Sequence, residues 1–160
     1  MTYAFNFRSA FCLVLLFFCG TMSFVQAAAT DEADAQETLT EYDFHVTSAY
    51  KDKTHPYYGK GDSMGFVING VPGMNLELVR GKTYTFRIDT GVMHDFYIAT
   101  KAIGWGKAAL TKDVKGNFTY KGVVTFTPSA NTPDTVYYVC RNHKYMGGEI
   151  HVVNANKAAK

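Results

Sequence analysis

The sequence has 160 residues, which is room for one domain and a short additional segment. Its formal net charge of +2 at pH 7 is close to neutral, and its basic residues form no dense cluster. Nucleic acid is therefore excluded as a partner, because binding to phosphates needs a strongly basic face.

The first 29 residues have the layout of a secretory signal peptide. Arg8 precedes an apolar block at residues 10–20, and small residues follow at 27–29. The pattern predicts cleavage after Ala27 or Ala29 and export to the periplasm or the extracellular space, with no membrane span left after cleavage. The alternative is an uncleaved anchor, because residues 10–29 match the roughly 20 residues that span a bilayer.

Signal cleavage would leave a single cysteine in the protein. It removes Cys12 and Cys19, and Cys140 remains. One cysteine cannot form a disulfide framework, and a free thiol in an oxidising compartment is a liability unless it is buried or ligated. Cys140 therefore needs a structural or chemical reason to be present.

The predicted mature chain has three parts. Residues 30–41 are acidic and poor in apolar groups, so we expect a mobile leader. Residues 42–154 form the predicted domain, and residues 155–160 form a polar tail that we expect to be disordered.

Short segments rich in aromatic and β-branched residues alternate with Gly, Pro and Asn through the domain. They predict about eight strands, at residues 41–50, 65–70, 76–81, 82–90, 95–100, 118–128, 134–140 and 147–153. Residues 55–65 are predicted as a loop, and the irregular section 101–117 as containing one helical turn at 107–110. This pattern is typical of an all-β sandwich or a small barrel.

Three potential metal ligands follow one another in the loop after the strand at 134–140. Cys140, His143 and Met146 are spaced three residues apart. Thiolate, imidazole and thioether are soft donors, which suit copper and not Mg²⁺ or Ca²⁺. Two imidazoles and a thiolate with a long axial Met form a copper site suited to electron transfer, so the loop lacks one imidazole.

This Cys-x2-His-x2-Met loop resembles the copper loop of the cupredoxins, and its spacing is most similar to that of amicyanin. The resemblance implies an antiparallel Greek-key β-sandwich that binds one copper ion at one end. It also implies a His ligand beside an earlier strand, a position that His94 occupies. His55 is the competing candidate. Asp95 follows His94 where relatives usually have Asn, so the contacts between the two ligand loops are expected to differ.

The predicted function is that of an exported type 1 (blue) copper protein, which carries single electrons and is not an enzyme. Four protein ligands leave no open position for a substrate. Two alternatives remain, namely copper storage or delivery, and a redox enzyme in which Glu149 or Asp95 replaces Met146 as a ligand. We expect protein redox partners to dock near His143, with acidic surfaces that match Arg141 and Lys144.

Overall fold

The computed structural model describes residues 41–155, and this part of the chain forms ten strands and no helix. The strands are β1 (Phe44–Tyr50), β2 (Met64–Ile68), β3 (Val71–Pro72), β4 (Leu76–Val79), β5 (Tyr84–Asp89), β6 (Phe96–Ala99), β7 (Val114–Lys115), β8 (Lys121–Phe126), β9 (Thr135–Cys140) and β10 (Gly148–Val153). Within these residues no helix has the length and apolar character to cross a membrane. The predicted signal peptide, most of the leader and the end of the tail lie outside the described residues.

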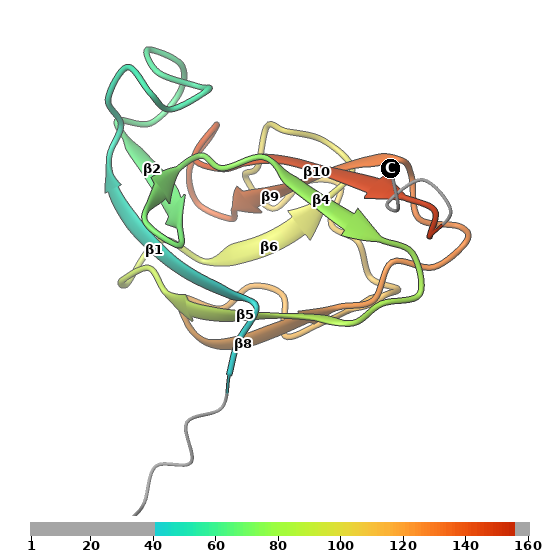
Figure 1. The fold of residues 1–160 in the computed structure, drawn as a ribbon. Coiled ribbons are helices and arrows are strands. Elements are labelled where there is room, and N and C mark those ends of the chain that lie inside the picture. Colours follow the sequence, from blue (N-terminus) through green and yellow to red (C-terminus); the bar gives the residue numbers. More distant parts are fainter. Residues whose placement is uncertain (1–40, 156–160) are drawn as a thin grey trace, which may run out of the picture. The chain divides into compact units, whose positions relative to one another are not determined.

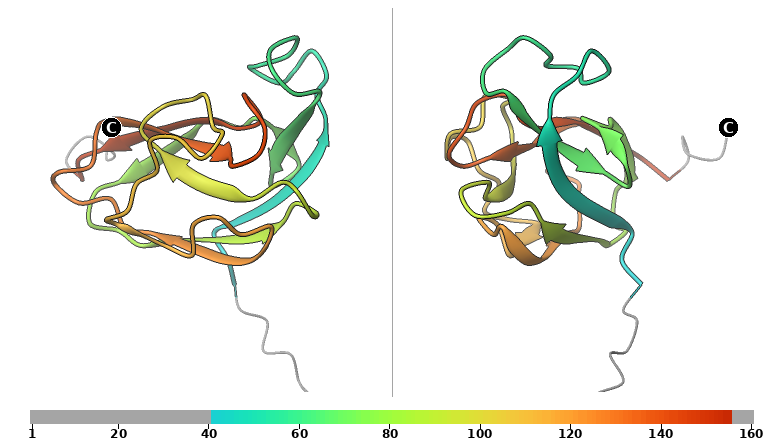
Figure 2. Two further views of the ribbon diagram at one scale, coloured as in Figure 1. Left: turned by 180° about the vertical axis from the view of Figure 1, so that it is seen from behind. Right: turned by 90° about the vertical axis from the view of Figure 1, so that its left-hand side faces the viewer.

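The strands form two sheets that face each other as layers (Figures 1 and 2). One sheet has the order β3-β2-β1-β5-β8-β7 and the other has the order β4-β10-β9-β6. Figure 1 shows β1 curving from the layer that contains β5 and β8 towards β2. The predicted all-β sandwich is therefore confirmed.

The expectation of an antiparallel sandwich is confirmed in part, because both sheets are mixed. β1 pairs in parallel with β5, and β4 pairs in parallel with β10, while the other neighbours are antiparallel. The chain crosses repeatedly between the two sheets, which agrees in part with the Greek-key expectation. The alternation of apolar residues reports which face of a strand is buried, but it carries no information on the direction of the neighbouring strand.

Two further details differ from the expectations. The structure has two strands of only two residues, β3 and β7, which are too short for any periodicity to reveal. No helical turn forms at residues 107–110. Instead Ala108 has a φ of 56° and its carbonyl accepts a bond from Thr100, while Ala109 bridges to Ala99. Pairing with the end of β6 thus overrides the local helix propensity of the two alanines.

Phe96 joins the two sheets in the core. Its ring lies 5.6 Å from that of Phe66 and 5.7 Å from that of Phe86 in the opposite sheet, and 5.9 Å from that of Tyr138 in its own sheet. All four side chains are buried. Burying a phenylalanine contributes about 1.5–3 kcal/mol, so this cluster holds the start of β6 firmly between the sheets.

The outer side of β6 is covered as well. All four residues of β6 are buried. Tyr97 points outward, packs against Phe118 at 4.7 Å between ring centroids, and donates its hydroxyl to the carbonyl of Lys107 at 2.9 Å. The irregular section 101–117 therefore lies against the outside of the four-stranded sheet and fixes β6 from that side.

Candidate metal centre

His94 and Cys140 meet because β6 and β9 are antiparallel neighbours. Cys140 is the last residue of β9 and its register partner is Phe96, the first residue of β6. The backbone N–H of Arg141 donates to the carbonyl of Asp95 at 2.8 Å, which continues the pairing one step beyond the strands. Strand pairing thus brings the upstream histidine to the cysteine at one end of the sheet.

His94, Cys140 and His143 form a cluster in which one donor atom of each lies within 4.8 Å of the others. Sγ of Cys140 lies 3.6 Å from Nδ1 of His143, and the two imidazole centroids are 4.9 Å apart. A metal with bonds of about 2.0–2.3 Å separates its ligand atoms by about 3–4 Å. The distance between Cys140 and His143 falls in this range, and the structure brings together three of the four predicted ligands.

One atom of this cluster lacks a partner. Within residues 41–155, Nδ1 of His94 is the buried side-chain nitrogen or oxygen that has no hydrogen-bond partner. Such an atom costs about 1–3 kcal/mol when it is left unpaired. A bound ion would supply the missing interaction, so the donor set fits a metal.

The electrostatics of the cluster favour the neutral donors. Burial raises the pKa of the Cys140 thiol. Burial also lowers the pKa of His94, and the neighbouring His143 lowers it further. Neutral imidazole is the metal-binding form, and a cation that approaches the thiol displaces its proton.

Met146 lies in the segment that returns from the cluster to β10, and its side chain is fully buried. Its carbonyl accepts the backbone N–H of Phe66 at 2.6 Å and lies 3.1 Å from Nε2 of His55. The backbone of this residue is therefore held by the opposite sheet. Ligation by its thioether stays a prediction.

His55, the competing candidate, lies outside the cluster. Its buried ring has Nε2 beside the Met146 carbonyl, and Nδ1 accepts the backbone N–H of Tyr57 at 3.1 Å. Both nitrogens thus have partners within the protein. His55 therefore contacts the backbone of the Met146 segment and does not join the cluster.

The two carboxylates considered as replacement ligands are directed elsewhere. Asp95 Oδ2 lies 3.9 Å from Arg141, and Glu149 Oε2 lies 3.5 Å from His151. Neither belongs to the cluster of potential ligands in the described part of the chain.

Two contacts that hold the ligand loops were not predicted, one between the loops and one from section 101–117. The side-chain amide of Asn142 donates to the carbonyl of Met93 at 2.8 Å. The backbone N–H of Trp105 donates to the carbonyl of Cys140 at 2.8 Å. Gly104 permits this approach, because a Cβ there would lie 2.6 Å from the Cys140 oxygen. The run Gly104-Trp105-Gly106 is the sequence feature that could have indicated the contact with Cys140.

Three residues around the cluster have a left-handed backbone. Met93, Trp105 and Tyr145 have φ values of 76°, 60° and 57°. This conformation costs free energy for residues with a side chain, and it recurs where a site fixes the backbone. These residues lie before β6, in section 101–117 and in the loop after β9, respectively.

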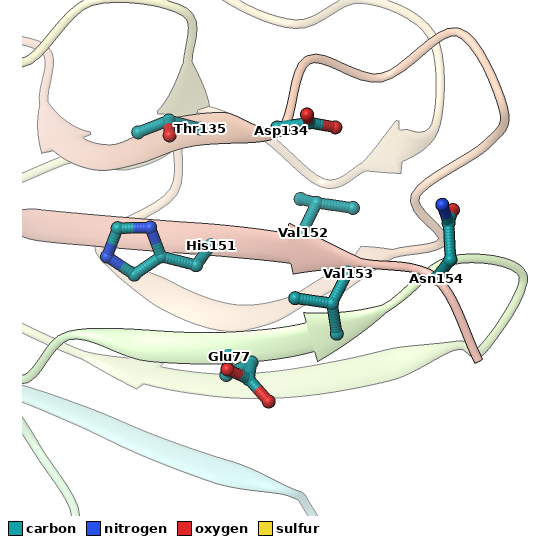
Figure 3. Close-up of a pocket in the computed structure, with 7 residues that line it drawn as sticks. All are labelled: Glu77, Asp134, Thr135, His151, Val152, Val153 and Asn154. Carbon is teal, nitrogen blue, oxygen red and sulfur yellow. The ribbon is translucent and has the colours of Figure 1, made fainter. Parts of the chain in front are cut away.

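A separate hollow on the four-stranded sheet does not share this chemistry. It is lined by Glu77, Asp134, Thr135, His151, Val152, Val153 and Asn154 (Figure 3). It contains one histidine and no sulfur, and β10 separates Glu77 on β4 from Asp134 beside β9. These side chains do not converge on one point.

A family model described as the At5g54830-like domain matches residues 56–154. The chain belongs to this family. The matched range of the At5g54830-like domain includes His94, Cys140, His143 and Met146.

Among curated proteins, this At5g54830-like domain is similar to protein Skeletor of Drosophila melanogaster. Isoforms B/C and D/E are each 30% identical to it in an alignment that covers 58% of this chain. The chain spans 19% of the length of isoforms B/C and 10% of isoforms D/E. It thus corresponds to a small part of these relatives.

Two solved structures resemble the At5g54830-like domain in fold. Rusticyanin from Thiobacillus ferrooxidans is 21% identical, with a TM-score of 0.37 over 68% of this chain and 76% of that one. The multicopper oxidase McoA of Aquifex aeolicus is 17% identical, with a TM-score of 0.39 over 72% of this chain and 27% of that one. The amicyanin-like loop spacing stays a prediction.

Proposed function

We propose that this At5g54830-like domain is a mononuclear type 1 copper protein that carries single electrons between redox partners. The observation that carries the proposal is the cluster of His94, Cys140 and His143 at one end of the sandwich. A bound copper ion supplies the redox chemistry, because it alternates between Cu(II) and Cu(I).

The residues of the chain bind the ion and exclude water from it. Cys140, His94 and His143 would hold the ion, and Met146 would supply a thioether as the fourth donor. Cys140 and Met146 are fully buried, so they keep water away from the inner side of the site. With four protein donors no position is left for a substrate, which favours a carrier over an enzyme.

The donor set also favours copper over zinc. Zinc binds Cys and His readily, but its structural sites use four such donors. In the proposed site the fourth donor is a thioether, which is a soft ligand typical of copper.

The surface beside His143 supports docking of another protein. Val92, Met93 and Trp105 are 70%, 64% and 55% exposed, although they are large and apolar. The ammonium group of Lys144 lies over the Trp105 ring at 4.3 Å, and the Arg141 side chain is exposed. An apolar surface with adjacent cations fits a redox partner with an acidic rim.

Export is part of the proposal. The signal-peptide pattern of residues 1–29 supports it, with the acidic leader following in the mature chain. The mass of the protein recovered outside the cytoplasm distinguishes cleavage after Ala27 from cleavage after Ala29 and from an uncleaved anchor.

The test is addition of one equivalent of Cu(II) to the purified domain. We expect an intense blue or green colour from thiolate-to-copper charge transfer and the paramagnetic-resonance signal of a type 1 site. Cys140→Ser should lose the colour and stay folded. His45→Ala, which changes an exposed histidine on β1, should keep it.

A colourless complex with ordinary tetragonal signals would contradict the type 1 assignment. Voltammetry distinguishes the carrier from a storage protein. A reversible wave supports electron transfer, while rapid loss of copper without a reversible wave favours storage or delivery.

A further inference from the structure

The loop between β1 and β2, residues 51–63, lies against the candidate copper loop, residues 140–147 (Figure 2). The backbone N–H of Asp62 donates to the carbonyl of Lys144 at 3.1 Å. The ammonium group of Lys51 donates to the carbonyls of Tyr57 at 3.0 Å and Tyr145 at 3.1 Å, and to that of Lys60. One backbone hydrogen bond and the Lys51 side chain thus join the two loops.

Gly61 allows the closest approach between them. It has a φ of 64°, and a Cβ at this position would overlap the Lys144 carbonyl. Glycine alone adopts this conformation without a steric penalty. The next residue, Asp62, is thereby held beside His143.

The Asp62 carboxylate is oriented by the backbone N–H of the residue two positions further on, Met64. Oδ1 accepts the N–H of Met64 at 2.8 Å, and Oδ2 lies 3.9 Å from Nε2 of His143. The other ring nitrogen, Nδ1, lies 3.6 Å from Sγ of Cys140. The imidazole of His143 thus lies between a carboxylate on one side and the thiol of the cluster on the other.

We propose that Asp62 is a positioning residue for His143, with a carboxylate that holds the imidazole proton on Nε2 and leaves the Nδ1 lone pair directed at the cluster. A neutral imidazole carries its single proton on either nitrogen, and a nearby carboxylate favours the N–H that faces it. At 3.9 Å the contact is longer than a direct hydrogen bond, so the effect is electrostatic in the metal-free protein. This role of Asp62 rests on the proposed copper-binding function, because His143 is one of the proposed ligands.

The test compares Asp62→Asn with the native protein. An Asn oxygen still accepts the Met64 N–H, but the amide then presents a donor to Nε2 and favours the opposite tautomer. The matched control is Asp52→Asn, which removes the same charge from an exposed position in the same loop. Asp62→Glu keeps the carboxylate and should rescue the native behaviour.

The first measurement uses the metal-free protein and therefore does not depend on copper binding. In ¹⁵N spectra recorded with His143 neutral, we expect the Nε2–H tautomer in the native protein and in the Asp52 and Glu variants. In Asp62→Asn we expect a shift towards Nδ1–H. The second measurement is Cu(II) affinity, which should fall about 10- to 100-fold in Asp62→Asn and remain unchanged in Asp52→Asn.

The outcomes separate this proposal from the proposed function. An unchanged tautomer in Asp62→Asn overturns the role of Asp62, as does a Glu variant that behaves like the Asn variant. The native protein can also give no type 1 spectrum while Asp62→Asn still shifts the His143 tautomer. That result contradicts the copper carrier and supports the positioning role.

Discussion

At the scale of single residues, three of the four predicted ligands are held through their backbone carbonyls and not through their donor atoms. Cys140 is fixed through its carbonyl by Trp105, and Met146 through its carbonyl by Phe66. His94 is fixed by its place just before β6, where the carbonyl accepts the Thr90 hydroxyl at 2.7 Å. None of these bonds uses a donor atom, and Sγ of Cys140 makes only long contacts, with the Met93 carbonyl at 3.8 Å and with Nδ1 of His143 at 3.6 Å.

We expect the removal of His94 and the removal of His55 to have different effects. We expect His94→Ala to abolish the coloured copper site, because it removes one of the clustered donors. His55→Ala should keep the colour but lower the free energy of unfolding by about 1–3 kcal/mol, since a buried hydrogen-bonding ring is lost. Visible spectra and urea unfolding of both variants provide the check, and the reverse pattern would exchange their roles.

Met146→Gln tests the fourth donor. An amide oxygen stabilises Cu(II) more than a thioether does, so we expect copper binding to persist and the reduction potential to fall. Voltammetry of the copper-loaded variant measures the shift. A potential equal to that of the native protein would show that the thioether is not a ligand.

At the scale of elements, loops fix the site as much as strands do. Section 101–117 covers β6 from outside and bonds to Cys140, while loop 51–63 covers the His143–Met146 segment. Another loop contact lies away from the site, where Asp113 accepts the hydroxyls of Thr132 at 2.6 Å and Ser129 at 2.9 Å.

This Asp113 contact predicts a pH-dependent contribution to stability. The hydroxyls, that of Thr132 above all, hold the pKa of Asp113 below its ordinary value. The folded pKa thus lies below the unfolded value of about 3.9, so the stabilisation is complete above that pH and is lost as pH falls through the folded pKa. Relative to native protein, Asp113→Asn should lower the free energy of unfolding by about 1 kcal/mol at neutral pH.

Urea unfolding of both proteins from pH 7 down to about pH 2 measures this difference. It should shrink below about pH 4, while the exposed control Asp89→Asn should show no such convergence. A difference that is constant over the whole pH range would contradict the ionic origin of the contact.

At the scale of the whole molecule, the site end of the sandwich carries both exposed apolar side chains and cations. Arg141 and Lys144 flank His143, and Trp105 lies under the Lys144 ammonium group. Charges on an exposed surface act on the rate of encounter and are screened over about 8 Å at physiological ionic strength.

We therefore expect electron transfer with an acidic partner to slow as salt rises. Arg141→Glu and Lys144→Glu should lower the rate at low salt and weaken its salt dependence. Lys82→Glu, at the opposite end of β5 from His94, should not. Stopped-flow reduction by candidate donors across a salt series is the measurement, and equal rates for all four proteins at low salt would exclude electrostatic docking while leaving the copper site unaffected.

The sequence by itself determined the all-β class, the eight longer strands and the loop that contains Cys140, His143 and Met146. These features are local, because residue type and alternation along a strand decide which face is buried. His94 was chosen over His55 through a family resemblance, since nothing in the spacing of the chain distinguishes the two.

Only the tertiary structure decided which strands pair in parallel, that section 101–117 covers β6 without a helical turn, and that Asn142 and Asp62 contact the ligand loops. Asp62 and His143 are far apart in sequence, and they meet because Gly61 brings one backbone against another. Such contacts depend on how distant segments pack in three dimensions, a property that short-range patterns of residue type do not contain.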